Sequence, residues 1–320
     1  MASQERWTGV LKVPVKTSNI GSFFKVAASL ILSSSSKTLA IPTANAVFFK
    51  GDRVEGTGNP VIERLSDSRN IADLLVSKLG ESVNAWVVEA STFNGPFAVY
   101  REFILIANSC GEPERYDPDG FPASSSIVSL ISKSIDQVKN ATMDIHSKAS
   151  SSSPSSSPET ILLGFSKGGT VINQIVAELA HLPGINDNKL RPQTSYKTKD
   201  GIFPASIDSF LLSISNFHYV DVGLNSHGAY LTDQIVIDKI ARNAAARNSR
   251  LNFVFHGTPR QWFDRNRPWI RREKDVMRQL LQDVAQKYGS SVLELEHLYY
   301  ADKHSNLQMH FEIIDIMNLI

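Results

Sequence analysis

Short apolar runs and amphipathic segments alternate along most of the chain. Apolar runs of about four to eight residues are typical of buried strands, and apolar residues spaced three and four apart are typical of helices. The runs predict strands over residues 44–49, 83–89, 161–163, 217–222, 251–255 and 291–298. The helical spacing predicts helices over residues 68–79, 125–138, 168–179, 233–245 and 269–288. Strands separated by helices form parallel βαβ units, so the pattern predicts an α/β fold with a mostly parallel, doubly wound sheet.

The first 43 residues have a different pattern. Residues 10–15, 23–32 and 38–41 are strand-like, and the polar stretch 33–37 is typical of a hairpin turn. We therefore expect an extension of antiparallel strands over residues 1–43. Before Asp52 the only acidic residue is Glu5, which is a bias of organelle transit peptides, but those peptides are also rich in arginine. Because arginine is scarce here, we expect folded strands rather than a cleaved leader.

Two polar stretches interrupt the pattern. Residues 149–158 contain only serine and proline after Ala149, and residues 186–199 are mostly polar. Segments with so few apolar residues cannot bury one face of a core. We expect both to be flexible loops or insertions within a single domain of 320 residues, whose 42% hydrophobic content is enough for one large core.

Charge and cysteine content narrow the range of partners. The formal net charge is +1, so nothing predicts binding to nucleic acid or to an anionic surface. Cys110 is the only cysteine, which excludes a disulfide within the chain and a thiolate metal cluster and fits a reducing, intracellular compartment. The apolar runs are shorter than the ~20 residues that a membrane-spanning helix needs. We expect a soluble protein without a metal or an organic cofactor.

The stretch Gly164-Phe165-Ser166-Lys167-Gly168 matches G-x-S-x-G between a predicted strand and a predicted helix. In that context the serine occupies a turn too tight for side chains, and its hydroxyl projects beyond the edge of the sheet. The following backbone N–H, here that of Lys167, can then bind an oxyanion. The alternative is an ordinary helix cap, since serine is a favoured N-cap residue. The flanking strand and helix favour Ser166 as the nucleophile of an α/β-hydrolase.

A second oxyanion donor is expected in the loop after the strand over residues 44–49, where α/β-hydrolases place one. That loop begins with Gly51 and Asp52. A backbone amide near these two residues is our candidate, and an ordinary solvent-exposed loop is the alternative.

A nucleophilic serine also needs a histidine, which follows the serine and the acid along the chain of this fold. His297, His304 and His310 lie near the end of the sequence. We favour His310, because it opens a helix-like stretch after a loop of suitable length. His297 falls inside a predicted strand, and His304 lies in a polar loop.

Two aspartates are candidates for the acid that orients the histidine. Asp221 lies at the end of the strand over residues 217–222. Asp264 lies four residues beyond Arg260, which occupies the neighbourhood where many α/β-hydrolases carry the acid. Either carboxylate can orient an imidazole. The rigidity of a strand end favours Asp221 and chain order favours Asp264; we prefer Asp264 slightly and leave both open.

With these residues assembled, the chain resembles a eukaryotic family named after open reading frame 69 of human chromosome 2, and in particular the plant members of that family. The matching pieces, in order, are VFFKGD at 47–52, AWVV at 85–88, LGFSKG at 163–168, YVD at 219–221, TP at 258–259 with Asp264 and Trp269, and MHF at 309–311. The resemblance implies an α/β-hydrolase-like fold with a serine nucleophile at Ser166, and an association with mitochondria. It brings no substrate. Lys50 stands where the family pattern has proline before Gly-Asp.

The sequence therefore predicts a serine hydrolase that acts on an ester, a thioester or a small acyl compound. Ser166 attacks, His310 moves the proton, Asp264 or Asp221 orients the histidine, and the amides of Lys167 and the Gly51–Asp52 loop bind the oxyanion. A non-catalytic hydrolase-like scaffold that binds a partner protein is the competing class, because fold does not settle function. The resemblance favours a mitochondrial location, with a cytoplasmic one as the alternative.

Overall fold

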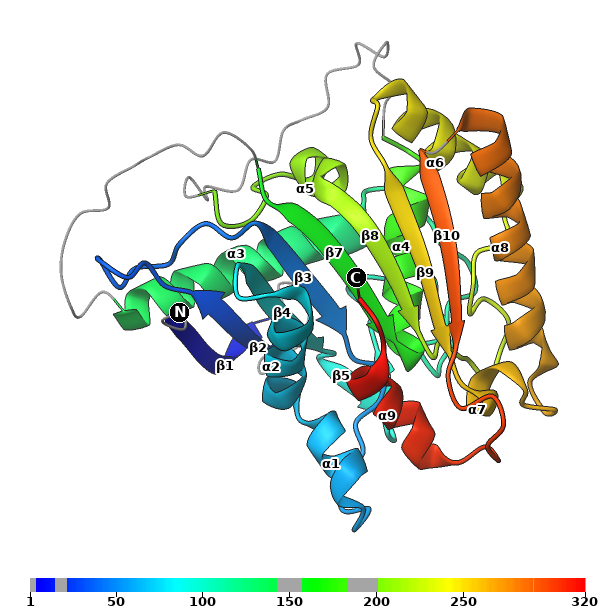
Figure 1. Ribbon diagram of the computed structural model, residues 1–320, viewed down its shortest axis with the longest axis horizontal. Helices are drawn as coiled ribbons and strands as arrows, with labels where there is room; N and C mark the ends of the chain where they lie inside the picture. The colour runs from blue at the N-terminus through cyan, green and yellow to red at the C-terminus, as the bar shows by residue number, and fades with distance from the viewer. Residues whose placement is uncertain (1–3, 15–21, 143–156, 183–200, 290, 320) are drawn as a thin grey trace.

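The computed structural model describes residues 4–14, 22–142, 157–182, 201–289 and 291–319 (Figure 1). Its main feature is an eight-stranded sheet in the order β1-β2-β4-β3-β7-β8-β9-β10. These strands are β1 (Arg6–Pro14), β2 (Phe23–Ile31), β3 (Ala44–Phe49), β4 (Val83–Glu89), β7 (Glu159–Phe165), β8 (Ile214–Val220), β9 (Leu251–Gly257) and β10 (Val292–Leu298). A two-stranded hairpin, β5 (Thr92–Asn94) with β6 (Phe97–Val99), stands apart from the sheet.

Within the large sheet only β2 runs against its neighbours. It pairs antiparallel with both β1 and β4, and every other described pair of strands in this sheet is parallel. The predicted α/β class with antiparallel N-terminal strands is therefore confirmed. The expected turn at residues 33–37 is also present, since Leu32 bridges to Leu39, but residues 38–41 form only this bridge and no strand.

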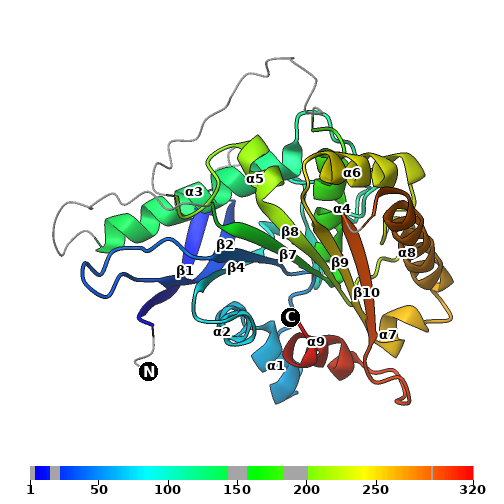
Figure 2. The same ribbon diagram turned by 45° about the horizontal axis from the view of Figure 1, so that its top comes forward.

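Helices cover both faces of the sheet. In Figure 2, helices α1, α2 and α9 lie below the sheet, and helices α3, α4, α5, α6 and α8 lie above it. The bounds are α1 (Pro60–Ser66), α2 (Ser68–Leu79), α3 (Pro122–Thr142), α4 (Gly169–Leu179), α5 (Ile207–Ser213), α6 (Gln234–Ala246), α7 (Pro259–Trp262), α8 (Pro268–Tyr288) and α9 (Leu307–Ile316). Each face has its own core of fully buried residues, with Trp86 and Phe253 on one side and Phe48 and Phe165 on the other.

The register of the parallel strands brings three segments to the same edge of the sheet. Phe49 at the end of β3 is level with Gly164 of β7, and Phe165 is level with Val220 of β8. The residues that follow these strands are therefore neighbours in space although they lie far apart in the sequence. Gly51, Ser166 and Asp221 all belong to this carboxyl edge, where ligands bind in open α/β sheets.

Three short helices, α1, α5 and α7, were not predicted. Helix α1 is capped by Asn59, whose side chain accepts hydrogen bonds from Val61 N and Ile62 N, and α5 is capped by Ser206. The predicted polar stretch 186–199 lies outside the described residues, and so does 149–158 apart from its last two residues. No helix among the described residues is long and apolar enough to cross a lipid bilayer.

Candidate active site

Strand β7 passes into helix α4 through a single 3₁₀ turn, η1 (Ser166–Gly168). Ser166 has a φ of 51°, a backbone conformation that side-chain-bearing residues rarely adopt and that is often found at functional sites. The two flanking glycines are required by close packing. A Cβ atom at Gly164 would lie 2.7 Å from Gly168 O, and one at Gly168 would lie 2.0 Å from Phe49 O. The sequence G-x-S-x-G thus folds here as a strained turn that presents Ser166 at the carboxyl edge.

The helix-cap alternative for Ser166 has no support in this geometry. The N-cap positions of η1 and α4 are Phe165 and Gly168, and neither makes a side-chain capping bond. Ser166 is only 5% exposed, and among the described residues its hydroxyl makes no hydrogen bond. A buried hydroxyl that does not serve the helix remains available for another partner.

The loop after β3 lies against this turn. A Cβ atom at Gly51 would lie 2.3 Å from Lys167 N, so only glycine allows the approach. Gly51 O accepts a hydrogen bond from Ala98 N at 2.9 Å, and Arg53 N donates one to Pro96 O at 2.7 Å. This pairing with the β5–β6 hairpin leaves Asp52 N–H without a partner in the described part of the chain. Gly51, which directly precedes the Asp52 amide, therefore packs against the turn that carries Lys167.

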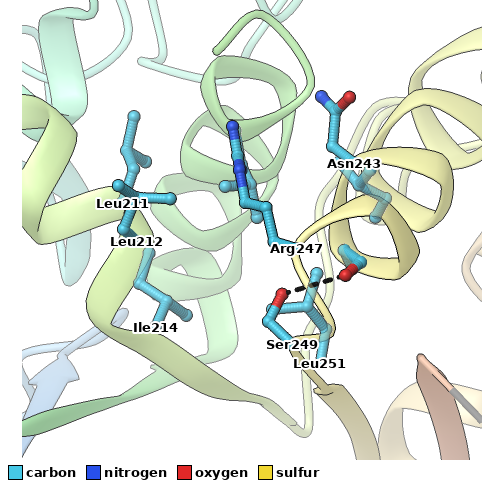
Figure 3. Close-up of a pocket in the computed structure, with 10 residues that line it drawn as sticks. Leu211, Leu212, Ile214, Asn243, Arg247, Ser249 and Leu251 are labelled. Atoms are coloured by element: carbon cyan, nitrogen blue, oxygen red, sulfur yellow. Dashed lines mark hydrogen bonds between the residues drawn. The ribbon is translucent and has the colours of Figure 1, made fainter. Parts of the chain in front are cut away.

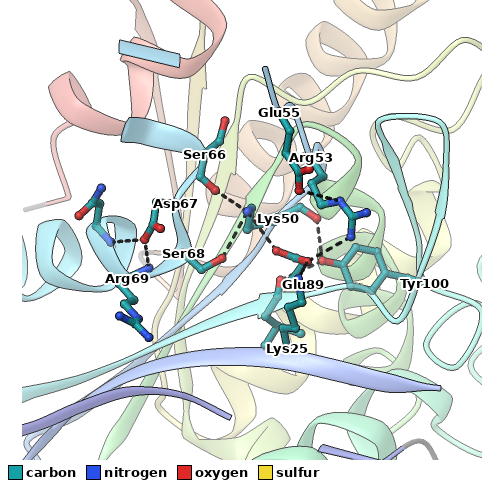
Figure 4. A network of polar contacts seen from close by, with 12 residues as sticks. Lys25, Lys50, Arg53, Glu55, Ser66, Asp67, Ser68, Arg69, Glu89 and Tyr100 are labelled. Atoms are coloured by element: carbon teal, nitrogen blue, oxygen red, sulfur yellow. Dashed lines mark hydrogen bonds and ion pairs between the residues drawn. The ribbon is translucent and has the colours of Figure 1, made fainter. Parts of the chain in front are cut away.

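Lys50, the residue that departs from the family pattern, anchors the end of β3 (Figure 4). Its side chain is 3% exposed, and Nζ donates to Ser66 O at 2.6 Å and to Ser68 Oγ at 3.3 Å and forms an ion pair with Glu89. The hydroxyl of Tyr100 donates to Lys50 O at 2.7 Å. Burial lowers the pKa of Lys50, and the nearby Glu89 carboxylate partly opposes this shift. The lysine thus ties the end of β3 to β4 and to the junction of α1 and α2.

His310 reaches the same edge from helix α9. The side chain of Asn306 caps this helix by accepting a hydrogen bond from Met309 N at 2.8 Å. His310 is 3% exposed, and its ring lies 4.6 Å from the ring of Phe165, centroid to centroid. The two other candidate histidines lie elsewhere: His304 is exposed in the loop before α9, and His297 stacks on His256 within the sheet.

The structure pairs His310 with Asp221. His310 Nδ1 lies 2.6 Å from Asp221 Oδ2. Asp221 follows β8 with a φ of 44° and is fully buried. Thr258 donates to both carboxylate oxygens, from its N–H at 2.7 Å and from its hydroxyl at 3.0 Å. The other candidate acid, Asp264, forms an ion pair with Arg267 at 2.8 Å and accepts a hydrogen bond from Asn266 N. This geometry does not support the slight preference that we gave Asp264 on the basis of chain order.

The other nitrogen of His310 has a partner that the sequence did not indicate. Nε2 lies 2.9 Å from Asp52 Oδ2, so both ring nitrogens face carboxylates. Burial alone would lower the pKa of His310, but the hydrogen bonds to Asp221 and Asp52 outweigh it and raise the pKa to about 9. At neutral pH the ring is therefore a cation that donates from both nitrogens. A base must offer a free lone pair, so His310 cannot act as a base while Nε2 donates to Asp52.

Sequence reasoning identified Asp52 for its backbone amide and missed its side chain. It also missed Thr258, whose N–H and hydroxyl hold the Asp221 carboxylate by hydrogen bonds. The signal for Thr258 was present, since threonine followed by proline is typical of the start of a helix, and Thr258 does cap α7. The contact between Asp52 and His310 joins residues 258 positions apart, and no local pattern encodes it.

Other parts of the molecule do not extend this site. The pocket in Figure 3 is lined by Ile214 and Leu251, the first residues of β8 and β9, together with the end of α6, so it lies at the opposite edge of the sheet. Among the described residues, no group of three or more His, Cys, Asp or Glu side chains is arranged to hold a metal ion.

The strand order, the helices on both faces and the strained turn after β7 together define an α/β-hydrolase-like fold. The chain belongs to the C2orf69 family, whose model matches residues 123–287, slightly more than half of the chain. A mouse protein named mitochondrial protein C2orf69 homolog is 26% identical over 157 residues, which are 48% of this chain and 34% of that protein. The zebrafish protein of the same name is 24% identical over 234 residues, 72% of this chain and 58% of that protein. The chain therefore spans between a third and three fifths of these relatives.

Solved structures similar to this chain include several esterases and related hydrolases. An IroE-like serine hydrolase from Shewanella oneidensis has a TM-score of 0.46 at 8% identity, covering 96% of this chain and 78% of that one. An S-formylglutathione hydrolase from Agrobacterium tumefaciens has a TM-score of 0.43 at 11% identity, covering 98% and 95%.

Proposed function

We propose that this protein is a serine hydrolase that cleaves an ester, a thioester or a small acyl compound, with Ser166 as nucleophile, His310 as base and Asp221 as the acid that orients it. The observation that carries the proposal is the 2.6 Å contact between His310 Nδ1 and Asp221 Oδ2, at the sheet edge that also presents Ser166. A carboxylate on Nδ1 holds the imidazole in the orientation that directs Nε2 away from it. Chain order also fits, because Ser166, Asp221 and His310 follow one another as on other α/β-hydrolases.

In the proposed reaction Ser166 Oγ attacks the acyl carbon while His310 Nε2 takes the hydroxyl proton. The oxyanion is bound by the N–H of Lys167 and by an amide of the Gly51–Asp52 loop. His310 then gives the proton to the leaving alcohol or thiol, and water releases the acid from Ser166 by the same steps in reverse. The cycle begins only when the Asp52 carboxylate has moved away from Nε2.

A fluorophosphonate probe tests this proposal, because it labels only an activated serine. We expect labelling of the wild-type protein and none of Ser166→Ala, with the two thermal midpoints nearly equal. Ser209→Ala is a matched control, since the Ser209 hydroxyl bonds to Ser206 in the capping box of α5, before the start of β8 and away from the carboxyl edge of the sheet. Labelling that survives Ser166→Ala would exclude Ser166 as the nucleophile.

One observation favours a second function, a non-catalytic scaffold that binds a partner protein. The Asp52 carboxylate occupies the nitrogen that a base needs, at 2.9 Å. If the probe labels neither the wild-type protein nor an Asp52→Ala variant that frees Nε2, the scaffold becomes the better interpretation. Two relatives carry the word mitochondrial in their names, and we propose the same location for this chain, which subcellular fractionation tests.

A further inference from the structure

The Asp52 carboxylate has one oxygen that is buried without a hydrogen-bond donor. Oδ2 receives the proton of His310 Nε2, whereas no donor reaches Oδ1 within the described residues. Asp52 is only 6% exposed. A buried acceptor without a donor costs about 1–3 kcal/mol, more when it is charged, so such groups in native proteins call for a partner that is missing.

The charges at this edge of the sheet do not balance. Two carboxylates, Asp52 and Asp221, share one imidazolium, which leaves one net negative charge in a buried place. Lys167 is close enough to attract Asp52 electrostatically, but its Nζ donates to Cys110 O at 2.8 Å rather than to the carboxylate. Arg53 pairs with Glu55 and Glu89. Among the described residues no lysine or arginine forms an ion pair with Asp52. A positively charged group brought by a ligand would supply the missing charge.

We propose that the site takes acyl substrates that carry a cationic amino group a few atoms from the reacting carbonyl, and that Asp52 is the residue that binds this group. The inference rests on the serine-hydrolase function proposed above. Asp52 is well placed for it, because it directly follows Gly51, whose backbone packs against the Lys167 amide, where the substrate oxygen would be held. An ammonium group donates hydrogen bonds to the oxygen that lacks a donor and neutralises the carboxylate at the same time.

The same contact explains how His310 becomes a base. The titratable groups that face its ring are Asp221 and Asp52, with Phe165 and Phe311 as the neighbouring rings. When an ammonium group pairs with Asp52, the attraction that keeps the proton on Nε2 weakens and the proton leaves to solvent. Nε2 then takes the proton of Ser166 Oγ as the bond from Oγ to the acyl carbon forms, and returns it to the departing alcohol.

Charge rather than hydrogen bonding decides between substrate classes. A neutral hydroxyl group would also donate to Oδ1, but it leaves the carboxylate charged and His310 protonated. A carboxylate or phosphate on the substrate would be repelled by Asp52 and bind worst. The ranking cationic, then neutral, then anionic therefore distinguishes this inference from a general preference for acyl groups of a certain size.

Three ethyl esters that differ only in the group on the third acyl carbon test the ranking: β-alanine ethyl ester, ethyl butyrate and monoethyl succinate, which are cationic, neutral and anionic at neutral pH. For the wild-type protein we expect kcat/KM, measured in a pH-stat and divided by the rate constant with hydroxide, to favour the cationic over the neutral ester by roughly tenfold or more. The anionic ester should be slowest. This comparison needs no variant.

Asp52→Asn keeps the shape of the side chain and removes its charge. We expect the preference for the cationic ester to disappear and the acid limb of the pH profile to move to lower pH. Glu55→Gln removes a charge from the same loop at an exposed position and should leave the ranking unchanged. Asp52→Ser serves if Asp52→Asn does not fold.

The outcomes separate the two proposals. Hydrolysis that depends on Ser166 but treats the three esters alike, or a ranking that survives Asp52→Asn, overturns the role of Asp52 and leaves the serine hydrolase standing. Hydrolysis that is equally fast in Ser166→Ala, or absent with all three esters, overturns the hydrolase and this inference with it.

Discussion

At the scale of single residues, the position of the Asp221 carboxylate depends on the backbone conformation of Asp221 and on hydrogen bonds from Thr258. Asp221 has a φ of 44°, and its N–H donates to His256 O at 2.7 Å, which extends the pairing of β8 with β9 by one residue. Thr258 then holds both oxygens of the carboxylate. These contacts leave Asp221 little freedom to rotate, so Oδ2 is fixed where it meets His310 Nδ1. A carboxylate held this way orients an imidazole without the entropy loss of ordering a mobile side chain.

Replacing this carboxylate by an amide tests the assignment. Asp221→Asn should reduce kcat/KM by ~10⁴-fold, because the amide favours the wrong tautomer of His310. Asp264→Asn should change kcat/KM little, since that side chain is bound to Arg267. Thermal melting of both variants separates loss of activity from loss of fold. A large loss of activity in Asp264→Asn with Asp221→Asn still active would reverse the assignment.

At the scale of secondary-structure elements, the sequence predicted the framework and missed the contacts that cross it. The strands over 44–49 and 83–89 were predicted with the bounds that β3 and β4 have, because buried parallel strands are continuous apolar runs. Helices α1 and α5 are seven residues each, too short for a helical period to show. The common location of Gly51, Ser166 and Asp221 could be predicted from the order of the strands, since parallel strands end at one edge of the sheet. The contact of Asp52 with His310 did not follow, because it depends on how α9 docks, and docking is decided by tertiary packing.

Lys50 offers a test of how β3, β4 and the α1–α2 junction position the oxyanion loop. Lys50→Met keeps the length of the side chain and removes its hydrogen bonds to Ser66 and Ser68 and its ion pair with Glu89. Glu89 keeps Lys25 and Arg53 as partners, so we expect a loss of about 1–3 kcal/mol in the free energy of unfolding. Because Gly51 follows Lys50 directly, kcat should fall more than KM rises.

Lys25→Met is the matched control for this prediction. Lys25 contacts the same glutamate, but its side chain is 41% exposed, so the loss in unfolding free energy should be at most about 1 kcal/mol, with kcat unchanged. Chemical denaturation and steady-state kinetics measure both effects. Equal losses of stability and activity in the two variants would show that Lys50 has no particular role in holding the loop.

At the scale of the whole molecule, buried histidines make the stability depend on pH from both sides. His218 and His256 are buried next to one another on β8 and β9, with His218 Nδ1 3.0 Å from His256 Nε2. Burial, together with a smaller effect of His297, lowers the pKa of His218 to about 3. Burial also lowers the pKa of His256. His310 has the opposite shift, to about 9. Near neutral pH the folded state therefore favours two neutral histidines and one charged histidine.

The pH dependence of unfolding follows from these shifts. Below the ordinary histidine pKa of about 6.5 the unfolded chain binds protons that folded His218 and His256 do not, so their contribution is lost as the pH falls from there towards 3. Folded His310 keeps a proton that the unfolded chain releases, so its contribution is complete below about 6.5 and is lost as the pH rises towards 9. We expect the free energy of unfolding in urea to be greatest near pH 6.5 and to fall on both sides, by at most about 1.4 kcal/mol per pH unit for each group. His218→Phe should make the acid side less steep, because it removes one of the two buried groups that bind protons only in the unfolded chain. Asp52→Asn should flatten the alkaline side, because it removes one of the two carboxylates that hold the His310 proton. A stability that stays constant from pH 5 to pH 9 in the wild-type protein would contradict both the neutral histidine pair in the sheet and the charged histidine at its edge.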